Sequence, residues 1–192
     1  MIDRSGLFNT SILAILLTVL YTSPVLRAAD MVDNPQYQSW ASHKPGTQVT
    51  LHNQAATPSD TIMTLKEITP EKITVSVVIV MESNGLKQQY TGPDTQIPSK
   101  IEKGREFMPS IGSQPAPADL QIKEAGRETI ELIGKKYECT IHTFEYTTTN
   151  GHITGKMWNT TAIPGSSAKM ELKIEGKNAR DGTATVVSIV EK

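Results

Sequence analysis

The sequence predicts an all-β fold, mainly antiparallel, with one short helix near its beginning. Apolar and polar residues alternate with a period of two in several runs, for example in residues 169–175, and such alternation is typical of strands buried on one face. Turn residues such as Ser83-Asn84-Gly85 and Asn150-Gly151 separate these runs. Strands do not alternate with long helical segments, so we do not expect a parallel sheet.

The first 28 residues are typical of a cleavable signal peptide. Arg4 and the terminal amine precede an apolar stretch over residues 12–20, which is shorter than the roughly 20 residues of a membrane-spanning helix. Small residues follow at Ala28 and Ala29, so we expect cleavage after Ala28 and a periplasmic or secreted protein with no stable membrane span. Leu26 is larger than is usual at its position, which leaves an uncleaved anchor as the alternative.

Residues 29–192 are long enough for a single domain with a core of its own. A short helix over residues 34–41 is expected at its start, because Asn34 is a good N-cap and Pro35 suits the first helical position. Tyr37 and Trp40 are three residues apart and would share a helix face. We expect this face to close one end of the sheet.

Four strands should follow the helix, and the last of them is the most polar, which indicates an edge. They are residues 48–52, 61–68, 72–81 and 87–91. Five prolines then occur between Pro93 and Pro117 and interrupt the alternation. Residues 104–119 are therefore expected to form a long Pro-rich surface loop, and loops of this length are often functional.

Turn residues in the C-terminal half predict the pairing of the strands. Gly134-Lys135 as the centre of a hairpin would place Leu132 opposite Tyr137, and Asn150-Gly151 would place Phe144 opposite Met157 and Tyr146 over Gly155. Final strands are expected over residues 169–175 and 183–190. Strands linked to their neighbours, with one polar face, favour a strongly curved sheet, either a half-barrel or a small barrel, open or closed.

The apolar side of the long strand after residue 135 changes along its length. Tyr137, Cys139 and Ile141 are odd-numbered, whereas Phe144 and Tyr146 are even-numbered. Since side chains of a strand alternate between its faces, this change predicts a β-bulge near residues 142–143.

Composition excludes several classes of function. The net charge of −1 and the lack of a basic cluster argue against nucleic-acid binding. Cys139 is the only cysteine, so no intramolecular disulfide is possible, and we expect it to be a buried apolar side chain rather than a cross-link between chains or a reactive thiol.

No motif for catalysis, phosphate binding or metal binding is present. The four histidines are too scattered for a zinc site, and His142 is expected opposite Asn159, far from His152. Glu128 is the one carboxylate of interest, because it could share an apolar face across from Ile141, although a glutamate at the sheet rim is the simpler interpretation. We therefore predict no enzymatic activity, no cofactor and no metal.

Several short segments together resemble a group of uncharacterised bacterial exported proteins whose sheets are similar to that of the outer-membrane lipoprotein carrier. They are the signal peptide, the capped helix with Trp40, Lys44-Pro45-Gly46-Thr47, residues 134–139, Lys156-Met157-Trp158 and Ile163-Pro164-Gly165. The resemblance implies an antiparallel half-barrel around a helix, with a concave face that shelters acyl chains in the carrier. This sequence has one evident helix, and no binding residue carries over.

We therefore hypothesise a non-enzymatic exported domain that binds a lipid, a lipoprotein or another apolar ligand on the concave face of its sheet. Methionines on the expected strands would give this face a flexible lining, and the candidate lining residues are Met63, Leu65, Met170, Leu172 and Ile174. The alternative is an envelope structural or assembly protein that binds a protein partner through a sheet edge or the loop at 104–119.

Overall fold

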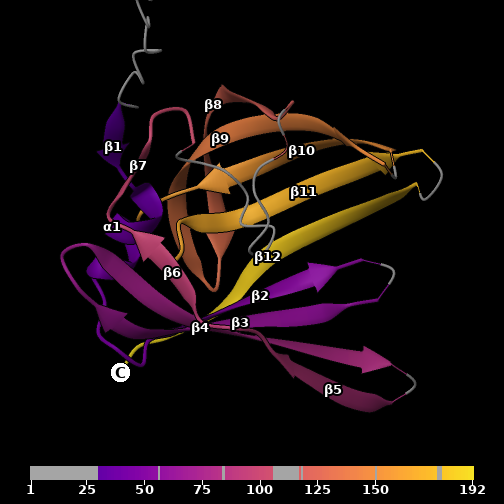
Figure 1. Cartoon of the computed structure of the whole chain (residues 1–192). Helices are drawn as coiled ribbons and strands as arrows, with labels where there is room; N and C mark the ends of the chain where they lie inside the picture. The colour runs from indigo at the N-terminus through magenta and orange to yellow at the C-terminus, as the bar shows by residue number, and fades with distance from the viewer. Residues whose placement is uncertain are drawn as a thin grey trace, which may run out of the picture.

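Antiparallel strands form most of the molecule, which confirms the predicted fold class (Figure 1). The computed structural model describes residues 30–55, 57–83, 85–105, 117, 119–149, 151–176 and 179–192. The signal peptide predicted at residues 1–28 and most of the loop predicted at 104–119 lie outside the described residues and stay predictions.

One ten-stranded sheet contains almost all of these strands, in the order β5-β4-β3-β2-β12-β11-β10-β9-β8, with β6 paired to β4 beside β5. Its strands are β2 (Gln48–Gln54), β3 (Ser59–Ile68), β4 (Lys72–Ser83), β5 (Leu86–Thr91), β6 (Thr95–Pro98), β8 (Gln121–Leu132), β9 (Lys135–Thr148), β10 (Gly151–Asn159), β11 (Ser167–Glu175) and β12 (Arg180–Val190). Two short strands, β1 (Met31–Asp33) and β7 (Lys100–Glu102), pair separately.

The large sheet is open, because β5 and β8 are its two edge strands and do not pair with each other (Figure 1). The polar strand at 87–91 is thus an edge, as predicted. The closed barrel is wrong, and so is the strong curling expected of a half-barrel. Alternation of apolar and polar residues indicates which face of a strand is wet, but it does not determine how far the sheet coils.

Helix α1 (Pro35–Ala41) begins as the sequence predicts. The Oδ1 atom of Asn34 accepts a hydrogen bond from the backbone N–H of Gln36 at 3.0 Å, and its Nδ2 donates to the carbonyl of Pro98 at 2.8 Å. Trp40 is completely buried, and the hydroxyl of Ser39 accepts from the N–H of Gly165 at 3.0 Å. These contacts attach the helix to the sheet and to the loop after β10.

Two apolar clusters stabilise the sheet. The first surrounds Trp40 and contains buried residues of β2, β3, β4, β6, β9, β10 and β12. The second has Phe144, Tyr146, Ile153 and Met157 at its centre, and Leu120, Ile122, Met170, Leu172 and Ile174 pack against it. All nine residues of the second cluster belong to β8–β11 or, for Leu120, directly precede β8.

Strand β9 contributes to both clusters, and the predicted change of its apolar side is confirmed. Its buried residues are odd-numbered as far as Ile141 and even-numbered from His142 onward. The pairing of β9 with β10 has no break. The register shift lies instead in the partner strand β8, between Glu124 and Gly126, so the bulge is opposite the predicted position and not in β9.

Both predicted hairpin registers are wrong by two residues. Tyr137 lies opposite Ile130, and Phe144 opposite Gly155. The first turn is centred on Ile133 and Gly134, both with positive φ (47° and 73°), and a positive φ is rare for a β-branched residue. Because a shift of two residues keeps every side chain on its face, the predicted faces remain correct.

Phe144 covers Gly155, so we expect Gly155→Ala to destabilise the protein by about 1–3 kcal/mol, the usual cost of overpacking. A Cβ at this position would lie against the ring of Phe144 and 2.8 Å from the carbonyl oxygen of Glu171. Urea unfolding measures the change. Gly92→Ala is the matched control, because its Cβ would meet only the carbonyl oxygen of Val77 at 3.8 Å. Equal stability of the two variants would contradict the close packing of Phe144.

Candidate functional site

The structure divides the five predicted lining residues between the two apolar clusters. Leu65 is 1% exposed in the first cluster, and Met63 packs against that cluster. Met170, Leu172 and Ile174 are partly buried and pack against the second cluster. The structure therefore brings three of the five residues together on β11 and places the other two elsewhere.

Strand pairing shows which residues surround these three side chains. Directly opposed residues share a face of a sheet, so Phe144, Gly155, Leu172 and Gly182 form one row across β9–β12. In the same way Ile174 lies opposite Arg180, which is exposed. This face of β8–β12 is thus an apolar surface with a cation beside it.

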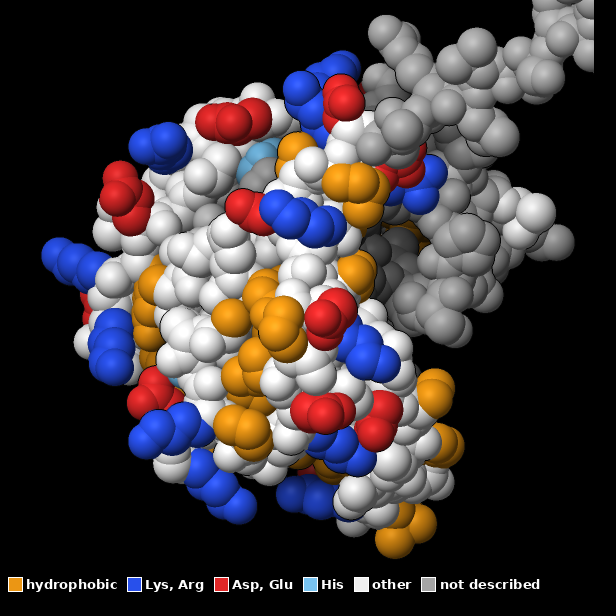
Figure 2. Space-filling model, turned by 60° about the vertical axis from the view of Figure 1, so that its left-hand side comes forward, with side chains coloured by type: hydrophobic (Ala, Val, Ile, Leu, Met, Phe, Trp, Pro, Cys, Tyr) orange, Lys and Arg blue, Asp and Glu red, His pale blue; other side chains and the backbone are white. Residues whose placement is uncertain are grey.

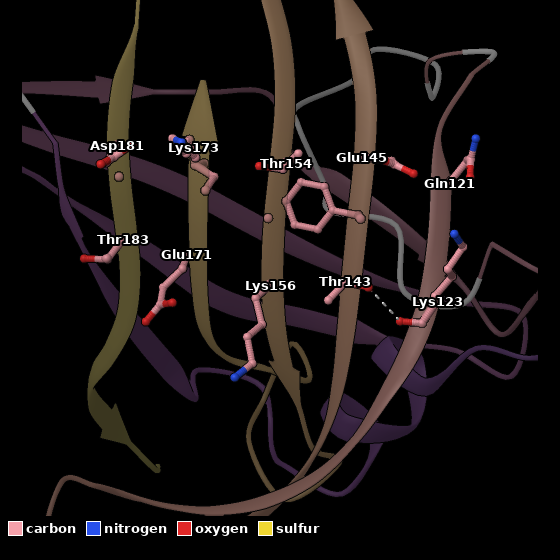
Figure 3. A pocket seen from close by; sticks show the side chains of 14 residues that line it. Gln121, Lys123, Thr143, Glu145, Thr154, Lys156, Glu171, Lys173, Asp181 and Thr183 are labelled. Atoms are coloured by element: carbon pink, nitrogen blue, oxygen red, sulfur yellow. Dashed lines mark hydrogen bonds between the residues drawn. The ribbon is translucent and has the colours of Figure 1, made fainter. Parts of the chain in front are cut away.

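The other face of the same five strands contains a groove of about 550 Å³ (Figure 3). Its floor follows the row from Phe144 to Gly182, and two rows of polar side chains border it. One row is Lys123, Thr143, Lys156, Glu171 and Thr183, and the other is Gln121, Glu145, Thr154, Lys173 and Asp181. Each row takes one residue from each strand, because these residues are directly opposed in the register.

Ion pairs in this region run mainly along the strands and not across the groove. On β11, Glu171 pairs with Lys169 and Lys173 with Glu175, each at 2.6 Å. The hydrogen bond to Glu175 raises the pKa of Lys173 above its ordinary value, and Lys173 lowers the pKa of Glu175. Glu171 and Lys173 are thus drawn away from each other, and the groove between them stays open.

Lys156 is also held from outside the groove, by Trp158 and Glu128. Its ammonium lies 4.2 Å from the centre of the indole ring and 3.8 Å from Oε2 of Glu128. The indole Nε1 donates to the same Oε2 at 2.8 Å, and Lys169 lies 4.6 Å from the ring centre. Cation–π and ionic contacts therefore fix the position of Lys156.

Glu128 differs from its predicted position. It lies opposite Cys139, whereas Gly126 lies opposite Ile141, and its side chain is half-exposed. Its hydrogen bond to Trp158 gives it a structural role at the sheet rim. The prediction that the protein is not an enzyme stays a prediction.

Cys139 is 1% exposed, as expected of a buried apolar side chain. Burial raises the pKa of its thiol, and the negative charge of Glu128 raises it further. Burial also raises the pKa of Tyr146. A thiol that is buried and kept protonated is a poor nucleophile.

The histidines do not form a metal site among the described residues, where no group of three His, Cys, Asp or Glu side chains is close enough to bind a metal ion. His142 lies opposite Met157 and not Asn159, but its Nδ1 is 3.1 Å from Nδ2 of Asn159. His152 lies 3.9 Å from Glu145. In the described part of the chain, no helix is both long and apolar enough to cross a membrane.

No protein-family model matches the chain, and no curated protein matches it. Two solved structures are similar to it. One is described as an exported protein with a YmcC-like fold from Bacteroides fragilis, with 11% identity, a TM-score of 0.48, and coverage of 78% of this chain and 97% of that chain. The other is the hypothetical lipoprotein YmcC from Escherichia coli, with 11% identity, a TM-score of 0.34, and coverage of 82% and 90%. The resemblance to the outer-membrane lipoprotein carrier stays a prediction.

The raised pKa values of Cys139 and Tyr146 predict a loss of stability at alkaline pH. The unfolded chain releases these protons near the ordinary values of 9.0 and 10.0, whereas the folded chain keeps them to higher pH. Stability therefore falls as pH rises above about 9, by at most about 1.4 kcal/mol per pH unit for each proton. Urea unfolding between pH 8 and 11 measures this slope.

Single variants separate the two contributions to this slope. Cys139→Ala should reduce the slope from about pH 9 upward, and Tyr146→Phe from about pH 10 upward. Slopes identical to that of the wild type in both variants would show that burial does not keep these groups protonated.

Proposed function

We propose that the chain is an exported, non-enzymatic β-domain that binds the acyl part of a lipid or lipoprotein on the apolar face of β8–β12. The observation that supports this proposal is the composition of the second apolar cluster. All its members come from one part of the sheet, and Met170, Leu172, Ile174, Leu120 and Ile122 are only partly buried. Helix α1 contributes only to the first cluster.

The residues beside this surface suit an amphipathic ligand. Strand β12 has the small residues Gly182 and Ala184 opposite Leu172 and Met170, which leaves the large side chains on β11 to provide the apolar contact. Arg180, opposite Ile174 and exposed, is placed to pair with a phosphate or carboxylate at the end of an acyl chain. Flexible methionine and leucine side chains adapt to such chains.

Export supports a ligand of this class, because lipids and lipoproteins are abundant in a bacterial envelope. The signal peptide predicted at residues 1–28 is the basis for proposing a periplasmic or secreted location. With a net charge of −1, a nucleic-acid partner is not expected.

A fluorescent fatty acid tests the proposal. The mature chain should bind dansyl-undecanoic acid, and Leu172→Asn should weaken binding by about 10- to 100-fold, because burying a leucine contributes about 1.5–3 kcal/mol. Arg180→Gln should weaken binding of the acid but not of the corresponding alcohol. Fluorescence titration gives each Kd, and circular dichroism checks that the variants fold.

Leu86→Asn is the matched control. Leu86 is 68% exposed on β5 and belongs to neither cluster, so its substitution should leave the Kd unchanged. Absence of binding to the wild type, or equal weakening by Leu86→Asn and Leu172→Asn, would refute the proposal.

A second candidate function is protein assembly through the edge strand β5, which is exposed at every position. Leu86 and Tyr90 are 68% and 51% exposed, Ile79 on the adjacent strand is 38% exposed, and Lys87 is the only charge in β5. Figure 2, by contrast, shows small hydrophobic groups among charged side chains of both signs on another face. The opposite edge, β8, is protected by its bulge and by five charged residues.

The assembly hypothesis predicts that Leu86→Lys with Tyr90→Lys abolishes capture of a partner from envelope extracts. Added lysines on an edge strand oppose pairing with another chain. Thr129→Lys, on the edge strand β8, should retain the partner. Capture that is unaffected by the β5 variant would exclude this edge as the interface.

A further inference from the structure

The groove on the polar face of β8–β12 has features of a ligand site that the proposed acyl site does not explain. We infer that this groove binds a segment of a neutral oligosaccharide. Rows of side chains on adjacent strands alternate between the two faces of a sheet, so the groove and the second apolar cluster lie on opposite faces. The inference is therefore independent of the proposed acyl site.

The dimensions of the groove suit one narrow polymer chain. Its two rows are two residues apart along each strand, which corresponds to about 7 Å. It crosses five strands, and their four spacings of about 4.8 Å give a length of roughly 19 Å. Figure 3 shows the polar side chains in two rows, with the ring of Phe144 between them.

The charges along the groove favour a ligand without net charge. Lys123, Lys156 and Lys173 are balanced by Glu145, Glu171 and Asp181, and positive and negative side chains occur in both rows. A polyanion would meet three carboxylates, and a polycation would meet three ammonium groups. Like charges in contact disfavour both kinds of ligand.

The polar groups of the groove offer the hydrogen bonds that sugar hydroxyls need. A hydroxyl both donates and accepts, and here carboxylates accept, lysines donate, and Thr143, Thr154 and Thr183 do both. Lysine stems and threonine methyl groups provide apolar contact for the C–H faces of a sugar ring.

The outward ion pairs keep these groups in place for a ligand. Glu171, Lys173 and Lys156 each have a partner outside the groove, so they are held at its border and do not close over its floor. Carboxylates and ammonium groups held in this way keep free lone pairs or N–H donors for a hydroxyl. A ligand need not break these ion pairs to enter.

Binding to an array of neutral tetrasaccharides with α- and β-linked glucose, galactose, mannose and N-acetylhexosamine tests the inference on the mature chain. We expect at least one tetrasaccharide to bind and to shift the backbone amide NMR signals of residues 143–145, 154–156 and 171–173. Thr154→Tyr, at the centre of one row, should fill the groove and weaken binding at least tenfold. Glu145→Gln and Lys173→Gln should each weaken it several-fold.

Thr129→Tyr is the matched control, because Thr129 is exposed on β8 outside the groove and its substitution should leave binding unchanged. Leu172→Asn, which tests the acyl site, should also retain the saccharide, so that the two proposals fail separately. The inference is overturned if no tetrasaccharide shifts the groove amides. Binding of only a heparin fragment or tetralysine would overturn it too, as would equal binding by the wild type and Thr154→Tyr.

Discussion

Burial on both faces of the β9–β10 pair is the constraint on which the rest of the structure depends. Met157 and Trp158 are neighbours in β10 and are 3% and 4% exposed. Because successive side chains of a strand point to opposite faces, both faces are covered at this position. The pair thus joins the first cluster, which contains Ile141 and Trp158, to the second, which contains Phe144 and Met157. Loss of this junction would separate the two halves of the core.

The junction also explains why one region has an apolar site and a polar groove. Beyond Ile141 the buried side of β9 changes to the even-numbered residues, so its odd-numbered residues, including Thr143 and Glu145, face away from the second cluster. The corresponding residues of the adjacent strands follow in register. At the point of change, Trp158 is covered by Lys156 and Lys169. The groove begins beside this covered indole.

Local signals in the sequence predicted local features well. Asn34 and Pro35 predicted the helix start, and the change from odd to even apolar residues predicted the two sides of β9. The registers required information that the sequence does not display, because the first turn is centred on Ile133 with φ of 47°. Parity likewise shows that a strand changes its buried side, but not which strand of the pair contains the extra residue. Here it is β8, at Ala125.

The groove could not be predicted for the same reason. Its two rows exist only when the registers of five strands are known together, and two of those registers were displaced by two residues. Such a displacement preserves the faces but changes which residues meet. A signal was present, since polar residues occupy alternate positions such as Thr154 and Lys156 on adjacent strands. The three lining residues on β11 were found because they alternate within one strand.

The sheet between the groove and the apolar face is a single layer of backbone. Molecules on its two sides would be separated by little more than the thickness of one pleated sheet, yet they could not touch through it, because the interior strands have neighbours on both sides. A glycolipid that occupied both surfaces would have to pass around the free edge at β8. The edge strand, with its bulge and its charged side chains, would then be the passage between a sugar-bearing side and a lipid-bearing side of the same wall.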